Sequence, residues 1–183
     1  MRKLIYTLLI LSITSCKGQE SNKTSDYKFS PENFNFTLDF QEKPAETQTE
    51  TQHYFGSIKI NQAFLEDKEK QMGFVVNYMN YKKENLDRMK PSLKEFYDFN
   101  EKQGAKQVSG EIIYSKSFTI DGLEGREVKT SMRNGELLMT SRMLLNGTEY
   151  YIWSVSYLKN NEWNKHKTEF LNGLKIESKI DRK

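Results

Sequence analysis

The chain has 183 residues, which suits one ordinary domain and is short for two. Its 28 Lys and Arg residues exceed its 25 Asp and Glu residues by only three, and nucleic-acid binding needs a concentrated positive field. A single cysteine excludes an intrachain disulfide and a cysteine-rich metal site, and two isolated histidines leave little for a histidine-based site. We therefore expect no cofactor, no bound metal and no nucleic-acid partner.

The first 15 residues have the form of a secretory signal peptide. Arg2 and Lys3 give a positive start, and the apolar stretch from Leu4 to Ile13 is too short for a permanent membrane helix, which needs about 20 residues. The segment ends in Ile13-Thr14-Ser15-Cys16, which resembles a bacterial lipobox. An ordinary signal peptide with a coincidental cysteine is the alternative. We expect export, lipidation of Cys16 and anchoring by that lipid to the cell envelope, at the outer membrane.

The residues after Cys16 divide into a linker, a domain and a tail. Lys17-Gly18-Gln19-Glu20 resembles in part the export signal of Bacteroidota surface lipoproteins, which leaves the membrane leaflet open. The polar segment 16–30 is low in aliphatic residues and is expected to be a flexible linker whose removal, from residue 17 to 29, leaves the fold intact. One domain is expected over 31–178, followed by a polar tail at 179–183.

Alternation of apolar and polar residues predicts a mainly antiparallel sheet. The expected strands are 34–40, 54–65, 72–81, 108–118, 123–132, 137–145 and 149–157. The polar run 46–52 fits either an edge strand or a loop. Asx-Gly pairs separate the last four strands, and such pairs favour hairpins, so these strands are expected to form an antiparallel meander.

Two segments have helical periodicity instead. Apolar residues three or four apart predict a helix, or a broken pair of turns, from Leu86 to Asn100, with Pro91 in the first turn of its main part and Gly104 at its end. A second helix is expected from Asn161 to Gly173, capped by Asn160 or Asn161, with Trp163 on its apolar face. The predicted class is α+β: an antiparallel sheet with one inserted helix and one C-terminal helix packed on it.

This order of elements, from about Phe34 to Ile176, resembles the PsbP-like fold of the PsbP, Mog and DcrB-related proteins. Gly122-Leu123-Glu124-Gly125-Arg126-Glu127 is similar to a Gly-x-x-Gly-Arg-Glu stretch of small bacterial members, although Leu-Glu stands where small-Pro is frequent. An arginine-bearing strand, 141–145, and a tyrosine-rich strand, 150–153, follow as in that family. The resemblance implies an α/β/α sandwich and a non-enzymatic binding or assembly role.

Four residues are candidates for partner binding: Arg126, Arg142, Tyr151 and Trp153. On a covered sheet face each arginine must pair with an acid such as Glu124, Glu127 or Glu136, and the alternative is an arginine that lines a groove for an anionic group. Tyr151 and Trp153 belong to the core, or to an exposed aromatic binding face if the sheet is covered on one side only.

No nucleophile elbow, phosphate loop, zinc-protease motif or dinucleotide fingerprint occurs in the sequence, so we expect no enzyme. The expected function is that of a membrane-anchored envelope lipoprotein that binds a protein partner. One alternative is a carrier of a small ligand held between sheet and helix, which requires an enclosed apolar pocket. Another is an immunity or chaperone-like protein associated with a secretion system. The sequence leaves the oligomeric state open.

Overall fold

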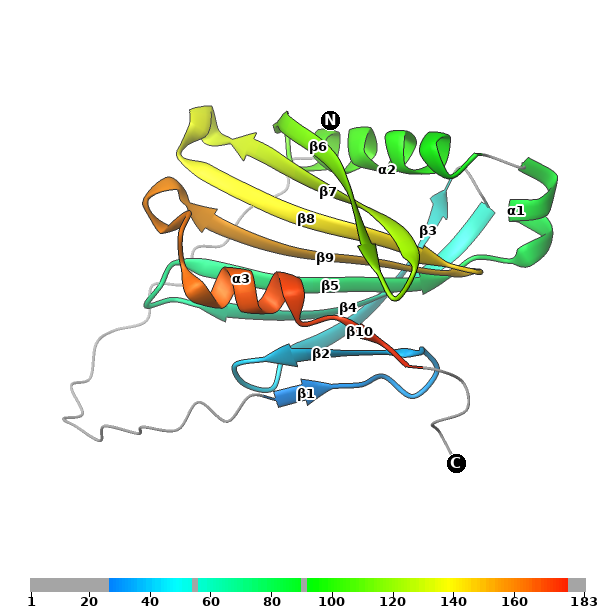
Figure 1. Cartoon of the computed structure of the whole chain (residues 1–183), viewed down its shortest axis with the longest axis horizontal. Helices are drawn as coiled ribbons and strands as arrows, with labels where there is room; N and C mark the ends of the chain where they lie inside the picture. The colour runs from blue at the N-terminus through cyan, green and yellow to red at the C-terminus, as the bar shows by residue number, and fades with distance from the viewer. Residues whose placement is uncertain (1–26, 54–55, 90–91, 178–183) are drawn as a thin grey trace, which may run out of the picture.

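The structure is a computed structural model that describes residues 27–53, 56–89 and 92–177. Within these ranges the chain forms a seven-stranded antiparallel sheet, of order β3-β4-β5-β9-β8-β7-β6, and a three-stranded sheet, of order β1-β2-β10 (Figure 1). Helices lie on both sides of the large sheet, so the predicted α+β class is confirmed. The expected signal peptide, Cys16 with its lipid, and the tail at 179–183 lie outside the described residues.

The strands are β1 (Tyr27–Phe29), β2 (Phe36–Phe40), β3 (Ala45–His53), β4 (Gly56–Asp67), β5 (Met72–Asn80), β6 (Glu111–Ile120), β7 (Leu123–Met132), β8 (Leu137–Asn146), β9 (Glu149–Leu158) and β10 (Lys175–Ile176). The helices are α1 (Lys83–Met89), α2 (Leu93–Gln107), the 3₁₀ turns η1 (Arg133–Gly135) and η2 (Lys159–Asn161), and α3 (Lys165–Asn172).

The predicted meander is present as β6–β7–β8–β9, each strand antiparallel to the next. Its first hairpin turns at Asp121 and Gly122, which have φ values of 50° and 79° and so need residues that tolerate left-handed backbone. The meander joins the earlier strands through its last strand, β9, which pairs with β5. The order of the strands in the sheet therefore differs from their order in the sequence. The ambiguous polar run becomes β3, a nine-residue strand at the edge of the sheet.

The small sheet was not expected. Its strand β1 lies inside the predicted linker and pairs with β2, while the two-residue strand β10 pairs with the other side of β2. Phe29 of β1 is only 3% exposed, and its ring contacts those of Phe36, Phe40 and Tyr78. Of the expected linker, residues 27–29 are therefore part of the domain, and a truncation that removes Phe29 takes a side chain out of the core.

The helices begin and end at other residues than expected. The broken pair of turns exists as α1 and α2, but α2 starts at Leu93 behind a capping box, in which the Ser92 hydroxyl accepts from the backbone of Glu95 and Glu95 reaches back to Ser92. Gly104 does not end α2, which continues to Gln107.

The C-terminal helix is shorter than predicted and has a different cap. α3 starts at Lys165 and is capped by Asn164, whose side-chain oxygen accepts from the backbone of His166 at 2.9 Å. The expectation of a cap at Asn160 or Asn161 is therefore wrong, because η2 occupies that position. Trp163 precedes the helix and is 92% exposed, so its predicted place on the buried face is wrong as well.

One face of the large sheet carries the main core, beneath the small sheet and α3 (Figure 1). Alternate residues of β5 and β9 point into it, and their aromatic rings pack against those of β2 and α3. The ring centres of Phe36 and Tyr151 are 4.9 Å apart, and those of Phe74 and Phe170 are 5.2 Å apart. Large aromatic groups that bury 150–250 Å² each compensate for the hydrophilic average composition of the chain.

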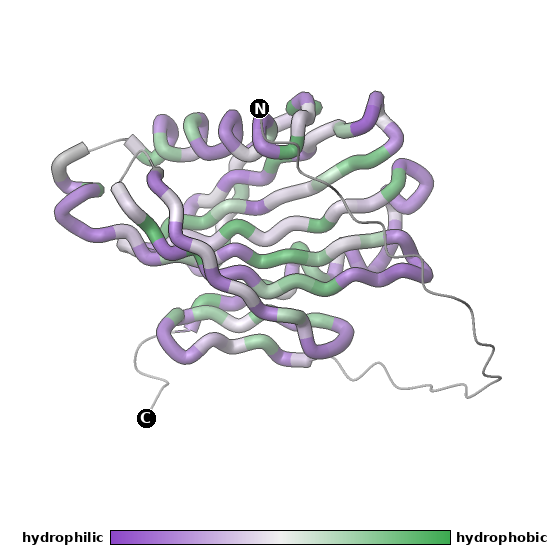
Figure 2. Tube along the Cα trace, turned by 180° about the vertical axis from the view of Figure 1, so that it is seen from behind, coloured by the Kyte–Doolittle hydropathy of each residue, from purple (hydrophilic) through white to green (hydrophobic). Residues whose placement is uncertain are grey.

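The intervening residues of the same strands form a second, smaller core with α2. Phe96 and Tyr97 of α2 pack against Tyr150, Met143 and Val128. Figure 2 shows that α2 lies along one long side of the sheet on this face, and that the strands beside it are not overlaid by a helix. The two faces therefore differ in how completely they are covered.

Candidate functional site

Arg142 is bound on several sides by groups of the domain itself. Its Nε donates to Glu127 at 2.7 Å, and its Nη1 donates to the backbone oxygen of Leu171 at 2.8 Å and to the Asn172 side chain at 2.9 Å. The guanidinium also lies 5.1 Å from the centre of the Phe118 ring. Arg142 thus ties β8 to the C-terminal end of α3, and the expectation of an ion pair with Glu127 is confirmed.

Glu127 is the acid on which this network converges. The carboxylate accepts from Arg142, from Lys116 at 2.9 Å and from the Tyr114 hydroxyl at 3.0 Å, while the residue is 5% exposed. Burial by itself would raise the pKa of Glu127, but the hydrogen bonds from Lys116, Arg142 and Tyr114 outweigh it and lower the pKa below its ordinary value. Glu127 is therefore a buried carboxylate held in its ionised form.

Arg126 faces the other side of the sheet and pairs with α2. Its Nη1 donates to Ser115 at 3.1 Å and lies 3.4 Å from Asp98 and 3.5 Å from Glu101. The expected ion pair of Arg126 is present, but its partners are Asp98 and Glu101 of α2 instead of the acids named from the sequence, Glu124, Glu127 and Glu136. Both candidate arginines are thus paired within the domain.

Tyr151 and Trp153 are core residues, each 0% exposed. The Trp153 indole donates to the backbone oxygen of Leu171 at 2.9 Å, and the Tyr151 hydroxyl donates to Glu149. The alternative of an exposed aromatic binding face built on these two residues is excluded, because α3 and the small sheet cover that face.

A groove of about 500 Å³ lies on the opposite face, between α2 and the edge of the sheet. We call it the α2 groove. Residues of β4, β5 and β9 form its floor, the second half of α2 forms one wall, and β3 forms the other. Its lining consists of Thr47, Thr49, Thr51, Gln52, Ile60, Gln62, Asn77, Met79, Tyr81, Phe99, Asn100, Gln103, Gly104, Gln107, Tyr150 and Ile152.

The lining of the α2 groove is uncharged. Charged residues are 29% of the chain, yet none of the groove's lining residues among those described is Asp, Glu, Lys, Arg or His. Amide and hydroxyl side chains supply hydrogen-bond donors and acceptors without a net charge, and Ile60, Met79 and Ile152 supply apolar surface. Such a lining suits an uncharged, hydrogen-bonding occupant.

Tyr150 adds a buried polar atom to this site. It is 0% exposed and its ring packs edge-on against Phe96 at 4.9 Å, while its hydroxyl has no hydrogen-bond partner among the described residues. Burial raises the pKa of Tyr150 well above its ordinary value, so the hydroxyl stays protonated. An unpaired buried hydroxyl costs roughly 1–3 kcal/mol, and each such group in a native protein needs an explanation.

Gly104 lies in the helical wall of the groove. It lies within α2, where glycine destabilises a helix by roughly 0.5–1 kcal/mol relative to alanine. A Cβ at this position would have no atom within 4 Å, so close packing does not explain the glycine. The sequence had presented Gly104 as a stop signal, whereas in the structure it lines the groove.

The outer edge of β3 is less protected than that of β6. Its register with β4 runs without a shift from Ala45–Phe64 to His53–Gly56, and Ala45–His53 contains neither lysine nor proline. The strand does carry two exposed glutamates, Glu46 and Glu50, which alternate with the threonines that line the groove. The opposite edge strand, β6, has a register shift between Ile112 and Tyr114 and carries Lys116. Bulges, charged side chains and prolines limit strand addition at an edge. Because β3 has no bulge, it is the more regular edge for pairing.

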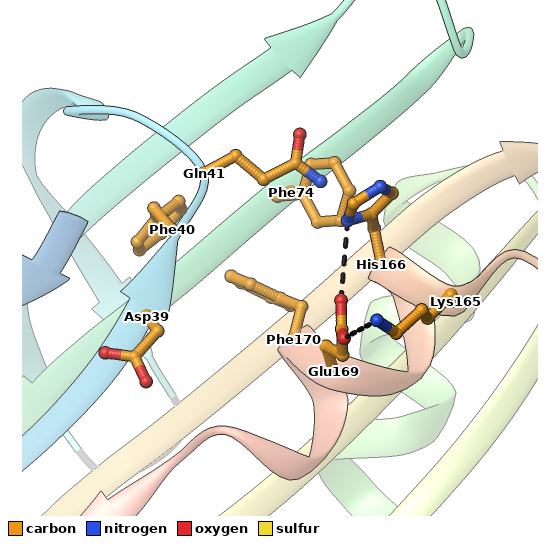
Figure 3. A pocket seen from close by; sticks show the side chains of 8 residues that line it. All are labelled: Asp39, Phe40, Gln41, Phe74, Lys165, His166, Glu169 and Phe170. Atoms are coloured by element: carbon orange, nitrogen blue, oxygen red, sulfur yellow. Dashed lines mark ion pairs between the residues drawn. The ribbon is translucent and has the colours of Figure 1, made fainter. Parts of the chain in front are cut away.

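A second hollow, of about 390 Å³, separates α3 from the end of β2 (Figure 3). On its α3 side, Glu169 pairs with Lys165 at 3.0 Å and with His166 at 3.4 Å. The Gln41 amide nitrogen is buried there without a partner among the described residues. The charged groups largely satisfy one another, so this hollow is the weaker candidate.

The residues of the α2 groove come from five separate stretches of the chain, so no single local pattern in the sequence marks the groove. Two local features of the groove are visible in the sequence: the polar run that forms β3, and Gly104 within the segment that forms α2. Neither feature identifies a site by itself, because the groove forms only when β3 and α2 lie on opposite sides of the same face of the sheet.

Within 27–53, 56–89 and 92–177, no helix is both long and apolar enough to cross a membrane. The same ranges contain no group of three or more His, Cys, Asp or Glu residues that could hold a metal ion.

Comparison with known proteins gives a match in structure only. No family model matches the chain, and no curated protein matches it in sequence. Among solved structures, it is similar to cyanobacterial PsbP (CyanoP) from Synechocystis sp. PCC 6803, with a TM-score of 0.58 and 10% sequence identity. The match covers 89% of this chain and 98% of that one. The chain therefore has a PsbP-like fold, and at this identity the likeness establishes the fold alone.

Proposed function

We propose that this protein is a lipoprotein of the bacterial cell envelope, of Bacteroidota type, that acts as a non-enzymatic binding module for a protein partner. The anchor would be lipid on Cys16, as the lipobox-like segment Ile13–Cys16 indicates. The binding site would be the α2 groove. The observation that carries the binding role is an uncharged groove beside an edge strand that has no bulge.

The shape and lining of the groove favour a partner protein over a small ligand. A carrier needs an enclosed, mainly apolar pocket, whereas the α2 groove is lined chiefly by amides and hydroxyls and has β3 as one wall. A free strand edge binds an extended segment through backbone hydrogen bonds, and flanking side chains select its sequence. We therefore propose that the partner supplies an extended, uncharged segment.

The same lining supports binding rather than catalysis. General acid–base chemistry needs a titratable side chain whose pKa lies near the working pH, and the groove residues offer only tyrosines whose pKa burial raises. The buried carboxylate Glu127 is occupied by Lys116 and Arg142 on the opposite face.

The anchor is tested by Cys16→Ala. The unmodified protein should stay with membranes through a high-salt wash, and the variant should move to the soluble fraction, because two or three acyl chains bind a bilayer far more firmly than surface contacts do. If the variant remains in the membrane after the wash, the lipid anchor is contradicted.

The groove is tested with two substitutions of Gly104. Gly104→Ala and Gly104→Arg should both fold, because a Cβ there meets open space and both residues favour helix more than glycine does. Only arginine places a long, charged side chain in the groove. Cross-linking and affinity capture should recover one near-stoichiometric protein with the wild type and Gly104→Ala, and lose it with Gly104→Arg.

Equal recovery with both variants would contradict the groove as the binding site. A co-purifying small molecule that Gly104→Arg displaces, with no protein, would support the carrier instead. The unpartnered Tyr150 hydroxyl is the observation that favours this second candidate.

A further inference from the structure

Trp163 is the most exposed large apolar residue among those described. It is 92% exposed, whereas the next, Ile113, is 52% exposed and the others lie between 37% and 43%. Single exposed apolar residues are common, but tryptophan carries the largest apolar surface and is usually mostly buried. An indole almost wholly in water needs an account of what it contacts.

The turn around Trp163 is held firmly on both sides. The Asn161 side chain donates to the backbone oxygen of Lys70 at 2.6 Å, Glu162 pairs with Lys129, and Asn164 caps α3. The neighbours of Trp163 are thus fixed to the domain, and the indole projects from a well-determined turn. A ring held outward in this way loses little further conformational freedom when it binds.

The composition around the indole matches that of a membrane interface. Lys159 and Lys165 flank it and are exposed, and the Lys165 side chain stays 83% exposed although it pairs with Glu169. Tryptophan is enriched at the headgroup level of bilayers, and lysines close to the surface are attracted to anionic lipid.

The start of the described chain lies at the same end of the domain. Tyr27 pairs with Phe40, and Phe40 lines the hollow in Figure 3 together with Lys165 and His166. Only residues 17–26 separate Tyr27 from Cys16, and a fully extended chain of that length spans at most about 40 Å. A lipid on Cys16 would therefore keep this end of the domain close to the bilayer.

We infer that Trp163 is an interfacial anchor, which seats the N-terminal end of α3 on the membrane surface with its indole at headgroup level. This inference rests on the proposed lipid anchor and adds an orientation to it. The lipid would set the distance from the bilayer, and Trp163, flanked by Lys159 and Lys165, would set which end of the domain faces it.

The experiment uses lipidated protein reconstituted into vesicles of phosphatidylethanolamine and phosphatidylglycerol, with and without bromine on the acyl chains. Bromine quenches tryptophan only at short range. The chain has two tryptophans and Trp153 is fully buried in the core, so quenching reports on Trp163. Trp163→Ser is the test variant, and Ile113→Ser, at an exposed site on β6, is the matched control.

We expect brominated vesicles to reduce the emission of the wild type and of Ile113→Ser, and to leave that of Trp163→Ser unchanged. If the wild type floats with the vesicles yet loses no more emission than Trp163→Ser, the interfacial role of Trp163 is overturned while the lipid anchor stands. If the wild type does not float with the vesicles, the lipid anchor is contradicted and this inference falls with it.

Discussion

The two faces of the large sheet are built from alternate residues of the same strands, yet they differ in what covers them. One face is closed by the small sheet and α3 and contains 19 buried residues of an aromatic core. Among the described residues, the other face has a core of eight buried residues that packs against α2 and Leu86 of α1, and it leaves the α2 groove beside them. The closed face therefore supplies most of the buried core, and the half-covered face has room for a partner.

The largest expected effect is on the closed face. Trp153→Ala should lower the free energy of unfolding by about 3–5 kcal/mol, because it removes a fully buried ring and the hydrogen bond that holds Leu171 of α3. Urea unfolding followed by far-UV circular dichroism measures this. Trp163→Ala, at an exposed site, should change stability by no more than about 0.5 kcal/mol. Similar losses in both variants would contradict the placement of the core.

Arg142 and Arg126 lie on opposite faces of the sheet, so their substitution compares the two faces directly. Arg142→Ala should cost about 2–3 kcal/mol, less than a fully buried pair, because Glu127 keeps Lys116. Arg126→Ala should cost about 1 kcal/mol, because its contacts with Asp98 and Glu101 are long and these acids keep Lys94 and the Ser115 hydroxyl as partners. Chemical denaturation of the two variants side by side tests this order, and a larger loss for Arg126→Ala would reverse the assignment of the stabilising face.

The lowered pKa of Glu127 predicts how the free energy of unfolding depends on pH. Its folded pKa is lowered, so the stability that it contributes is fully present above the ordinary value of 4.5 and is lost as the pH falls through the folded pKa. Glu127→Gln should therefore be less stable than the wild type near neutral pH, and the difference should shrink below about pH 4.5. The urea midpoint measured against pH tests this, with exposed Glu124→Gln as the control. A difference that stays constant with pH would contradict it.

No loss of stability is expected in the α2 groove. Tyr150→Phe should be as stable as the wild type or more stable by up to about 1–3 kcal/mol, because it removes a buried hydroxyl that has no partner among the described residues. Tyr97→Phe is the matched control on the same face, since its hydroxyl donates to the backbone oxygen of Glu124 at 2.8 Å and accepts from the backbone N–H of Leu145 at 3.0 Å. It should lose about 1–2 kcal/mol. An equal loss in both variants would show that the Tyr150 hydroxyl is satisfied.

Local patterns explain which parts of the fold could be predicted. Alternation along β9 and Asx-Gly turns at 121–122 and 146–147 act over a few residues, and they predicted the meander correctly. β1 and the two-residue β10 could not be found in this way, because each is too short for a periodic pattern and exists only by pairing with β2. The capping box at the start of α2, Ser92 to Glu95, is readable in the sequence, whereas the position expected for Pro91 lies outside the described residues.

The α+β class and the meander follow from the sequence alone, because they depend on side-chain alternation and on turn residues. For Arg142 the sequence named Glu127 only as one of three acids that could pair with it, and the fold selected it. Only the tertiary structure decided that Tyr151 and Trp153 are buried, that Arg126 pairs with α2, and that β3 and Gly104 line one groove. Burial and cavities depend on what packs against a strand, and those partners lie far away in the chain.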